Sequence, residues 1–122
     1  MILTHRLVGL VALCALAAPS VSADTVVKVG SVLALTWPFA SMGEGVDRGA
    51  ALYMKLNRDK LPKGVSIELI RRDNAGPNPT AAKRLVQEMV VRDQIKYLTG
   101  AIFTPDAAAI APLATEAKLP FI

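Results

Sequence analysis

Hydrophobic and polar positions along the chain follow two alternating periods, the two-residue period of strands and the longer period of helices. Valine, leucine and threonine dominate Thr25 to Leu33, which predicts a buried strand. From about Met42 to Arg58 hydrophobic residues recur every three or four positions, which predicts a helix. The expected inward face of this helix comprises Val46, Ala50, Tyr53, Met54 and Asn57. The loop between these elements carries the aromatic residues Trp37 and Phe39.

A second strand and a second helix follow the turn residues Leu61 to Gly64. Hydrophobic and polar side chains alternate from Val65 to Arg71, as expected of a strand. Asn78 is a preferred capping residue, and Pro79 suits the first position of a helix. We therefore predict a helix from Pro79 onward, whose hydrophobic stripe comprises Ala82, Leu85, Val86, Met89 and Val90.

A third strand is predicted over Gln94 to Thr99, followed by a turn at Gly100. A third helix is predicted from Pro105 to about Ala117, with an inward face of Ile110, Leu113, Ala114 and Ala117. Pro112 falls inside this span, so we expect it to remove a hydrogen bond and kink the helix, or the helix to start later. Leu119 to Ile122 reads as the beginning of a fourth strand.

The predicted elements alternate from strand to helix along the whole chain. This order predicts an α/β fold class with a doubly wound parallel sheet and right-handed crossovers. A parallel sheet needs cover on both faces, and the fourth strand has only a few residues. We therefore expect the sequence to be the N-terminal part of a larger protein, and we expect this part not to fold alone.

The first 23 residues have the pattern of a secretory signal peptide. His5 and Arg6 form the charged start, and a hydrophobic run too short to span a bilayer follows. Val21-Ser22-Ala23 has the small residues of a cleavage site, so the mature chain is expected to start near Asp24. The one cysteine, Cys14, would leave with the signal, which excludes disulfides and thiolate ligands in the mature part.

The charge of the mature part argues against nucleic acid as a partner. Removing Arg6 with the signal leaves 13 Lys and Arg residues against 10 Asp and Glu residues, a net charge of +3. The basic residues are spread along the chain, often beside acidic ones as in Arg92-Asp93, and few aromatic residues lie among them. This pattern is typical of a scattered surface charge.

The stretch with the clearest potential for binding runs from Tyr97 to Asp106, where a strand ends, a glycine turns the chain and a helix opens. Thr104 is a good N-cap, and Pro105 suits the first helical position. A helix N-terminus at the carboxyl edge of a parallel sheet presents backbone N–H groups to a small anion. We predict that this corner holds the charged head of a small molecule, which Asp106 would repel unless its carboxylate points away.

Other kinds of chemistry fit the sequence poorly. The glycines of Gly43 to Gly49 resemble a dinucleotide fingerprint, but their spacing is one residue too long and they begin ten residues after Leu33. The sole histidine, His5, lies in the signal, and no serine has a plausible base. A solvated or capping role is expected for four scattered carboxylates: Glu44, Asp47, Asp73 and Asp106. We predict no enzymatic activity, no cofactor and no metal site.

Three further side chains belong to the same edge of the sheet as Thr104. Trp37 follows the first strand, and a core position and a place in a ligand cleft are equally consistent with it. Met42 lies at the start of the following helix, and Phe103 could cover the hydrophobic part of a ligand. For Phe39 a structural role is the favoured interpretation. The predicted ligand-binding residues are therefore Trp37, Met42, Phe103 and Thr104.

Several motifs along the mature part keep a fixed order and spacing. They are Val27 to Leu33, Pro38-Phe39-Ala40 with Gly43, Gly49-Ala50, Ile67-Glu68-Leu69 with Asp73, Asn78-Pro79, and Leu98-Thr99-Gly100 before Thr104. Together they resemble the N-terminal region of branched-chain amino-acid-binding proteins, the periplasmic receptors of ABC importers with the type I fold. Each motif is weak alone, but their order makes the resemblance fairly specific.

This resemblance implies that residues 24–122 are a partial N-terminal lobe of a two-lobed type I periplasmic binding protein, truncated at the fourth strand. It implies a periplasmic protein that binds a small amino acid or a related carboxylate or amide between its lobes and delivers it to a membrane permease. Thr104 would hold the ligand α-carboxylate. Met42 would stand where relatives often have an aromatic residue, with Trp37 compensating. A disulfide found in some relatives is missing, since Ala75 and Phe103 stand near its positions.

Two other classes of function are compatible with the same fold class. A ligand-sensing domain of a receptor or regulator would carry a transmembrane or signalling domain after Ile122. An exported α/β enzyme would need all its catalytic residues outside the sequence considered. The residues after Ile122 would distinguish both classes from a solute-binding protein.

Overall fold

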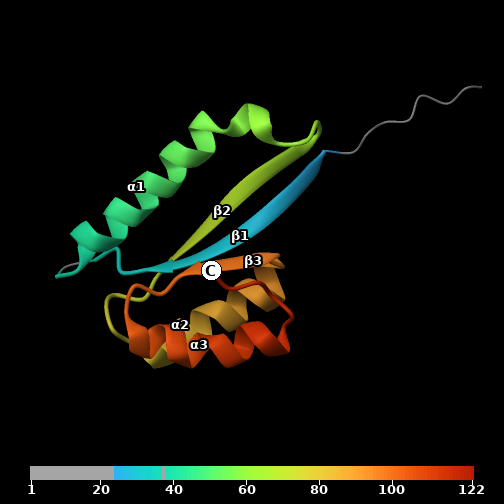
Figure 1. The fold of residues 1–122 in the computed structure, drawn as a ribbon. Helices are drawn as coiled ribbons and strands as arrows, with labels where there is room; N and C mark the ends of the chain where they lie inside the picture. Colours follow the sequence, from blue (N-terminus) through green and yellow to red (C-terminus); the bar gives the residue numbers. More distant parts are fainter. Residues whose placement is uncertain (1–23, 37) are drawn as a thin grey trace, which may run out of the picture.

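The computed structural model describes residues 24–36 and 38–122, and the predicted signal peptide lies outside the described residues. Figure 1 shows strands in one layer with helices on both sides. In chain order the elements are β1 (Thr25–Leu33), α1 (Ala40–Leu56), the 3₁₀-helix η1 (Arg58–Lys60), β2 (Val65–Asp73), α2 (Pro79–Glu88), the π-helix η2 (Met89–Asp93), β3 (Tyr97–Gly100) and α3 (Thr104–Glu116). The predicted α/β fold class is confirmed.

The sheet is parallel, with the strand order β2-β1-β3. β1 pairs with β2 along its whole length and with β3 over Val29 to Val32. Beyond β3, Leu98 forms a parallel bridge with Phe121. The N–H of Leu98 donates to the carbonyl oxygen of Pro120 at 2.9 Å, and the N–H of Ile122 donates to that of Leu98 at 3.0 Å. The predicted fourth strand therefore begins at the outer edge of β3.

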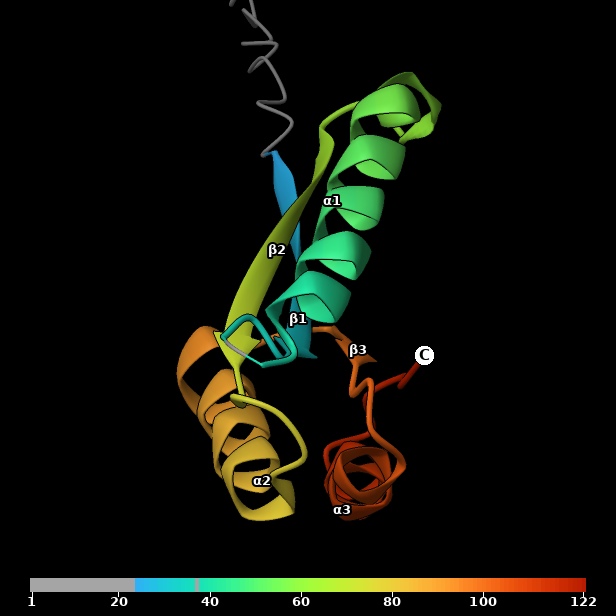
Figure 2. The same ribbon diagram turned by 90° about the vertical axis from the view of Figure 1, so that its left-hand side faces the viewer.

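The helices cover the two faces of the sheet unequally. Figures 1 and 2 show α2 and α3 side by side against one face and α1 over the other. As predicted, the hydrophobic stripes of α2 and α3, which repeat with the helical period, face the sheet. Together with the sheet they form the main hydrophobic core. The buried hydrophobic residues of this core are Val32, Ala82, Leu85, Val86, Met89, Ile95, Leu98, Ile110 and Ala114.

The predicted start of α2 is confirmed in detail. Pro79 is its first residue, and Oδ1 of Asn78 accepts a hydrogen bond from the N–H of Ala81 at 3.0 Å. A side-chain acceptor at the N-cap satisfies one of the free N–H groups of the first turn. The strand after α2 begins later than predicted, at Tyr97, because the helix continues through η2 and ends at Gln94 in the left-handed conformation (φ 56°).

One prediction about α3 was wrong. Phe103, not Thr104, occupies the N-cap position, with an extended backbone (φ −100°, ψ 133°), and Thr104 is the first helical residue. The N-cap preference of threonine is therefore overridden by the course of the chain out of β3. α3 runs through Pro112, so of the two alternatives predicted for this residue the later start is excluded, and Pro112 lies inside the helix without an N–H to donate.

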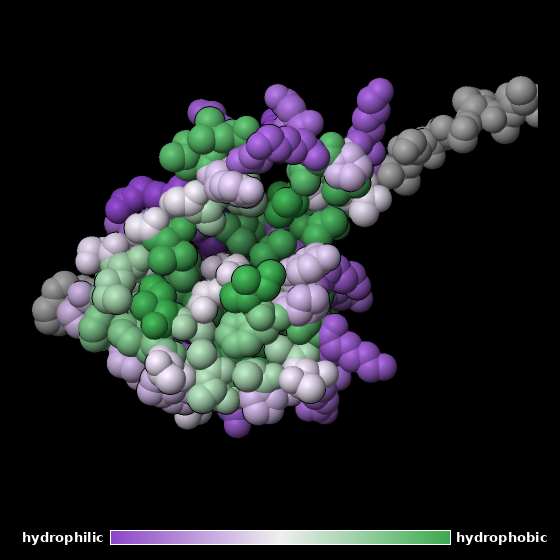
Figure 3. Space-filling model, viewed as in Figure 1, coloured by the Kyte–Doolittle hydropathy of each residue, from purple (hydrophilic) through white to green (hydrophobic). Residues whose placement is uncertain are grey.

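The predicted inward face of α1 was only partly right. Ala50, Met54 and Asn57 are half-buried, but Val46 is 50% and Tyr53 70% exposed. The rotation of α1 is fixed by the contact of Gly43 with the end of β1, where an added Cβ would lie 1.9 Å from the carbonyl oxygen of Ala34. This contact turns a hydrophobic stripe of α1 to the surface, consisting of Met42, Val46, Tyr53 and Leu56. Figure 3 shows hydrophobic residues on this face.

Candidate functional site

Three loops leave the sheet at its carboxyl edge, the left-hand end in Figure 1. They are residues 34–39 after β1, residues 74–78 after β2 and residues 101–103 after β3. Because the three strands are parallel, α1, α2 and α3 all begin at this edge. In open α/β sheets ligands bind at the carboxyl ends of the strands, so we take this edge as the candidate site.

The chain passes from β3 to α3 in close contact with β1. Gly100 has a φ of +101°, and a Cβ there would lie 2.3 Å from the carbonyl oxygen of Val32, so this close approach requires glycine. The next residue, Ala101, has a φ of +59°, and its N–H donates to the same carbonyl at 2.8 Å. This turn fixes the point at which α3 starts.

Thr104 lies exposed at the opening of α3. The carbonyl oxygen of Phe103 accepts from the N–H groups of Asp106 at 3.0 Å and Ala107 at 3.1 Å, which closes the first turn. Pro105 has no N–H, and the N–H of a first helical residue has no partner within its helix. Thr104 therefore offers a backbone N–H and a hydroxyl group side by side to a small anion.

Two aromatic rings join the loops beside Thr104. The rings of Phe39 and Phe103 meet edge to face, with centroids 4.9 Å apart and an interplanar angle of 72°. Gly76, in the loop after β2, lies against the ring of Phe39, since a Cβ at Gly76 would be 2.8 Å from that ring. Phe39 thus has the structural role that was expected, and the loops after all three strands meet at its ring.

Asp73, the last residue of β2, ties the loop after β2 to the loop after β1. Its Oδ1 accepts from the N–H of Leu35 and from the N–H of Ala75, both at 2.8 Å. Burial alone would raise the pKa of Asp73, but these two hydrogen bonds and one from the Thr36 side chain outweigh it, so the pKa is lowered. The carboxylate is therefore a structural acceptor, in agreement with the capping role that was expected.

Asn74 and Asp106 join the loop after β2 to the first turn of α3. Nδ2 of Asn74 donates to Oδ2 of Asp106 at 2.6 Å, and both side chains are buried. Burial raises the pKa of Asp106, although the N–H of Asn78 and the amide of Asn74 act in the opposite direction. Of the two roles expected for Asp106, solvated or capping, its burial excludes the first, and its carboxylate points inward and accepts from Asn74.

The structure brings three of the four predicted site residues to one edge. Phe103 and Thr104 are consecutive, and the N–H of Met42 donates to the carbonyl oxygen of Phe39, whose ring contacts Phe103. Trp37 lies outside the described residues. Sequence reasoning missed the pairing of Asn74 with Asp106, and the only signal for it was a polar pair directly after a strand end.

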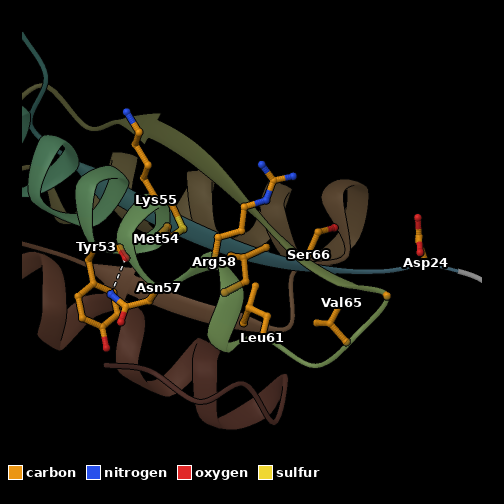
Figure 4. Close-up of a pocket in the computed structure, with 11 residues that line it drawn as sticks. Asp24, Tyr53, Met54, Lys55, Asn57, Arg58, Leu61, Val65 and Ser66 are labelled. Carbon is orange, nitrogen blue, oxygen red and sulfur yellow. Dashed lines mark hydrogen bonds between the residues drawn. The ribbon is translucent and has the colours of Figure 1, made fainter.

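A separate hollow of about 610 Å³ lies at the opposite, amino edge of the sheet. Figure 4 shows its lining, which comes from the C-terminal end of α1, the turn after it and the beginning of β2. Inside it the Nδ2 of Asn57 donates to the carbonyl oxygen of Tyr53 at 2.8 Å. None of the predicted ligand-binding residues borders this hollow, so it is distinct from the candidate site.

Neither a cluster of metal ligands nor a membrane-spanning helix occurs in the described part of the chain. Within residues 24–36 and 38–122, no group of three or more His, Cys, Asp or Glu side chains lies together as a metal site would need. No helix in the same ranges has the length and hydrophobicity to cross a bilayer.

Residues 26–122 match a family described as periplasmic binding protein. Among curated proteins, a Leu/Ile/Val-binding protein homolog 6 of Brucella abortus is 36% identical over 111 residues, which are 91% of this chain and 28% of that protein. The same figures hold for the homolog of Brucella suis. The chain thus spans about a quarter of the length of these relatives.

Solved structures of similar fold cover about four fifths of this chain. One is a solute-binding protein of an ABC transporter from Rhodopseudomonas palustris BisB5, solved in complex with 3,4-dihydroxybenzoic acid. It is 41% identical to this chain with a TM-score of 0.72, and the match covers 79% of this chain and 26% of that protein. One from R. palustris in complex with 4-hydroxybenzoate is 35% identical with a TM-score of 0.75, with coverages of 80% and 26%. The isoleucine-bound LivJ of Streptococcus pneumoniae, 21% identical with a TM-score of 0.71 over 80% of this chain and 28% of that protein, shares the fold.

Proposed function

This chain belongs to the periplasmic binding protein family, and on that premise we propose that it is part of an exported solute-binding protein that serves an ABC importer. Its ligand is a small carboxylate, held between two lobes of which residues 24–122 form part of the first. Binding favours the closed arrangement of the lobes, which the membrane permease recognises. The observation that carries this proposal is the exposed Thr104 at the opening of α3.

The carboxylate of the ligand accepts hydrogen bonds from the hydroxyl and the N–H of Thr104. The N-terminal end of α3 adds a favourable electrostatic contribution, because helix N-termini carry partial positive charge. The remainder of the ligand lies against Phe103 and Met42, and against Trp37, which the sequence places on the same edge. No bond of the ligand is made or broken.

We favour an aromatic carboxylic acid as the ligand over a branched-chain amino acid. Solute-binding proteins 35% and 41% identical to this chain were solved with hydroxybenzoates, whereas the isoleucine-bound relative is 21% identical. The edge-to-face pair of Phe39 and Phe103 beside Thr104 supports the same choice, because an aromatic ligand ring can extend such packing. Amino acids remain the second class to be tested.

The first experiment is isothermal titration of the full-length protein with 4-hydroxybenzoate, benzoate, leucine and isoleucine. Thr104→Val keeps the shape of the side chain but removes one hydrogen bond to a charged group, which costs about 1.5–3 kcal/mol. We therefore expect Kd to rise roughly 10- to 100-fold.

Thr115→Val is the matched control, because Thr115 lies on the same helix and its hydroxyl donates within the helix, to the carbonyl oxygen of Ala111 at 3.1 Å. Its Kd should equal that of the wild type. An unchanged Kd for Thr104→Val would show that Thr104 does not hold the carboxylate.

A further inference from the structure

Asp106 and Asn74 share one hydrogen bond but leave two acceptors without a donor. The bond joins Nδ2 of Asn74 to Oδ2 of Asp106 at 2.6 Å, and the residues are 3% and 0% exposed, respectively. Among the described residues, no donor forms a hydrogen bond with Oδ1 of either side chain, and both oxygens are closed off from solvent. A buried acceptor without a donor destabilises the fold, so this pair is incomplete as an ionised carboxylate and an amide.

One proton would complete the pair. A carboxylic acid and a primary amide pair in a cycle, in which the amide N–H donates to one carboxyl oxygen and the acid O–H donates to the amide oxygen. The N–H half of this cycle is present, and the two oxygens that lack partners are the two that the O–H half joins. We propose that Asp106 is protonated when the corner holds a carboxylate, so that the ligand anion binds together with one proton. This inference rests on the proposed function.

The position of Asp106 explains why its proton matters for the ligand. Asp106 is the acidic residue in the first turn of α3, the turn whose N-terminal end holds the ligand carboxylate. An ionised Asp106 would compete with the ligand for the positive end of the helix and would repel it. A neutral Asp106 leaves the helix end to the ligand. By reciprocity, the bound anion makes the protonated form of Asp106 more favourable.

Charged groups on the surrounding elements do not compensate for an ionised Asp106. Those nearest in the fold bond elsewhere or face solvent: Asp73 accepts from Leu35 and Ala75, Arg72 pairs with Asp93, Arg84 pairs with Glu88, and Lys83 is exposed. The groups that favour the ionised form are the amide of Asn74 and the N–H of Asn78, and burial outweighs them, which raises the pKa. Burial therefore makes the ionised form of Asp106 costly in the free protein, and a bound anion would add to that cost.

The test counts protons taken up on binding. The full-length protein is titrated calorimetrically with 4-hydroxybenzoate, or with leucine if 4-hydroxybenzoate does not bind, between about pH 5.5 and 8, where the carboxylates of these probes stay ionised. Two buffers of different ionisation enthalpy give the number of protons at each pH. We expect uptake of up to one proton and a Kd that rises with pH by at most about tenfold per pH unit.

D106N is the variant that keeps the cycle without a titrating group, because an amide N–H replaces the acid O–H and donates to Oδ1 of Asn74. It should bind the probe without proton uptake, with a Kd that does not change with pH and that lies below the wild-type value at the upper end of the range.

Binding by the wild type without proton uptake would overturn the inference and leave the proposed function intact. So would proton uptake that persists in D106N. Failure of every carboxylate to bind would overturn the proposed function, and the inference with it. The wild-type proton count decides the matter even if D106N does not fold.

Discussion

Asp73 offers the sharpest test of how the candidate site is held together. Its Oδ1 accepts from the N–H of Leu35 in the loop after β1 and from the N–H of Ala75 in its own loop, both at 2.8 Å. Asp73→Ala removes this acceptor and leaves two backbone donors without a partner. Asp73→Asn keeps an acceptor oxygen at the same place but removes its charge.

The expected loss of stability follows from these two bonds. A hydrogen bond to a charged group contributes about 1.5–3 kcal/mol, and we take the lower end for each, because the bond from Leu35 is partly buried and the bond from Ala75 is exposed. Asp73→Ala should therefore lower the free energy of unfolding by about 3 kcal/mol. Asp73→Asn retains neutral hydrogen bonds worth about 1 kcal/mol each, so it should cost about 1 kcal/mol.

Acid should reduce the difference in stability between Asp73→Ala and the wild type. The pKa of Asp73 in the folded protein lies below its ordinary value of 3.8. A carboxyl group with a lowered folded pKa contributes stability above its unfolded pKa, and this contribution is lost as the pH falls through the folded pKa. As the pH falls through this lowered pKa, the wild type should therefore lose the part of the stabilisation that depends on the charge and approach the stability of Asp73→Asn.

Urea unfolding of the full-length protein between pH 7 and about pH 3 measures both effects. Asp47→Ala is the matched control, because Asp47 pairs with the exposed side chain of Arg71 instead of with backbone N–H groups. A surface ion pair contributes at most about 1 kcal/mol. The reasoning fails if Asp73→Ala costs no more than Asp47→Ala at pH 7, or if its cost does not shrink in acid.

Two further substitutions test the packing that positions the site. Gly43→Ala would place a Cβ 1.9 Å from the carbonyl oxygen of Ala34, so α1 must shift, and we expect a loss of about 2 kcal/mol despite the better helix propensity of alanine. Thermal unfolding measures it, and an increase in Tm would contradict the contact. Leu98→Ala empties a fully buried core position and should cost about 2–5 kcal/mol in urea unfolding. Val91→Ala, at an exposed position, should stay within about 0.5 kcal/mol, and equal losses would contradict the assigned core.

Features that depend on neighbouring residues could be predicted from the sequence. The run of β-branched and hydrophobic residues predicted β1 with its observed bounds, Thr25–Leu33, because such residues favour a strand locally. Asn78 and Pro79 located the start of α2, because a cap and a first-turn proline act within one turn of helix. The hydrophobic stripe of α2 followed from its period alone.

Features that depend on contacts between distant segments could not be predicted. The rotation of α1 is set by Gly43 against Ala34, and no periodicity within α1 reports that contact. The extended N-cap at Phe103 follows from the tight turn of the chain against Val32. The burial of Asp106 depends on Asn74, which lies 32 positions earlier in the chain.

The loop after β2 reaches a different neighbour from each of three positions, through Asp73 to Leu35, through Asn74 to Asp106 and through Gly76 to Phe39. The loop after β2 is therefore ordered by the fold itself. Ordering a backbone costs about 1–2 kcal/mol of conformational entropy per residue, and here that loss accompanies folding instead of binding. A ligand held at this edge meets a preorganised surface. Affinity would then depend also on residues that do not contact the ligand. A substitution that loosens this loop would raise its conformational entropy in the unbound protein, and binding would have to remove that entropy.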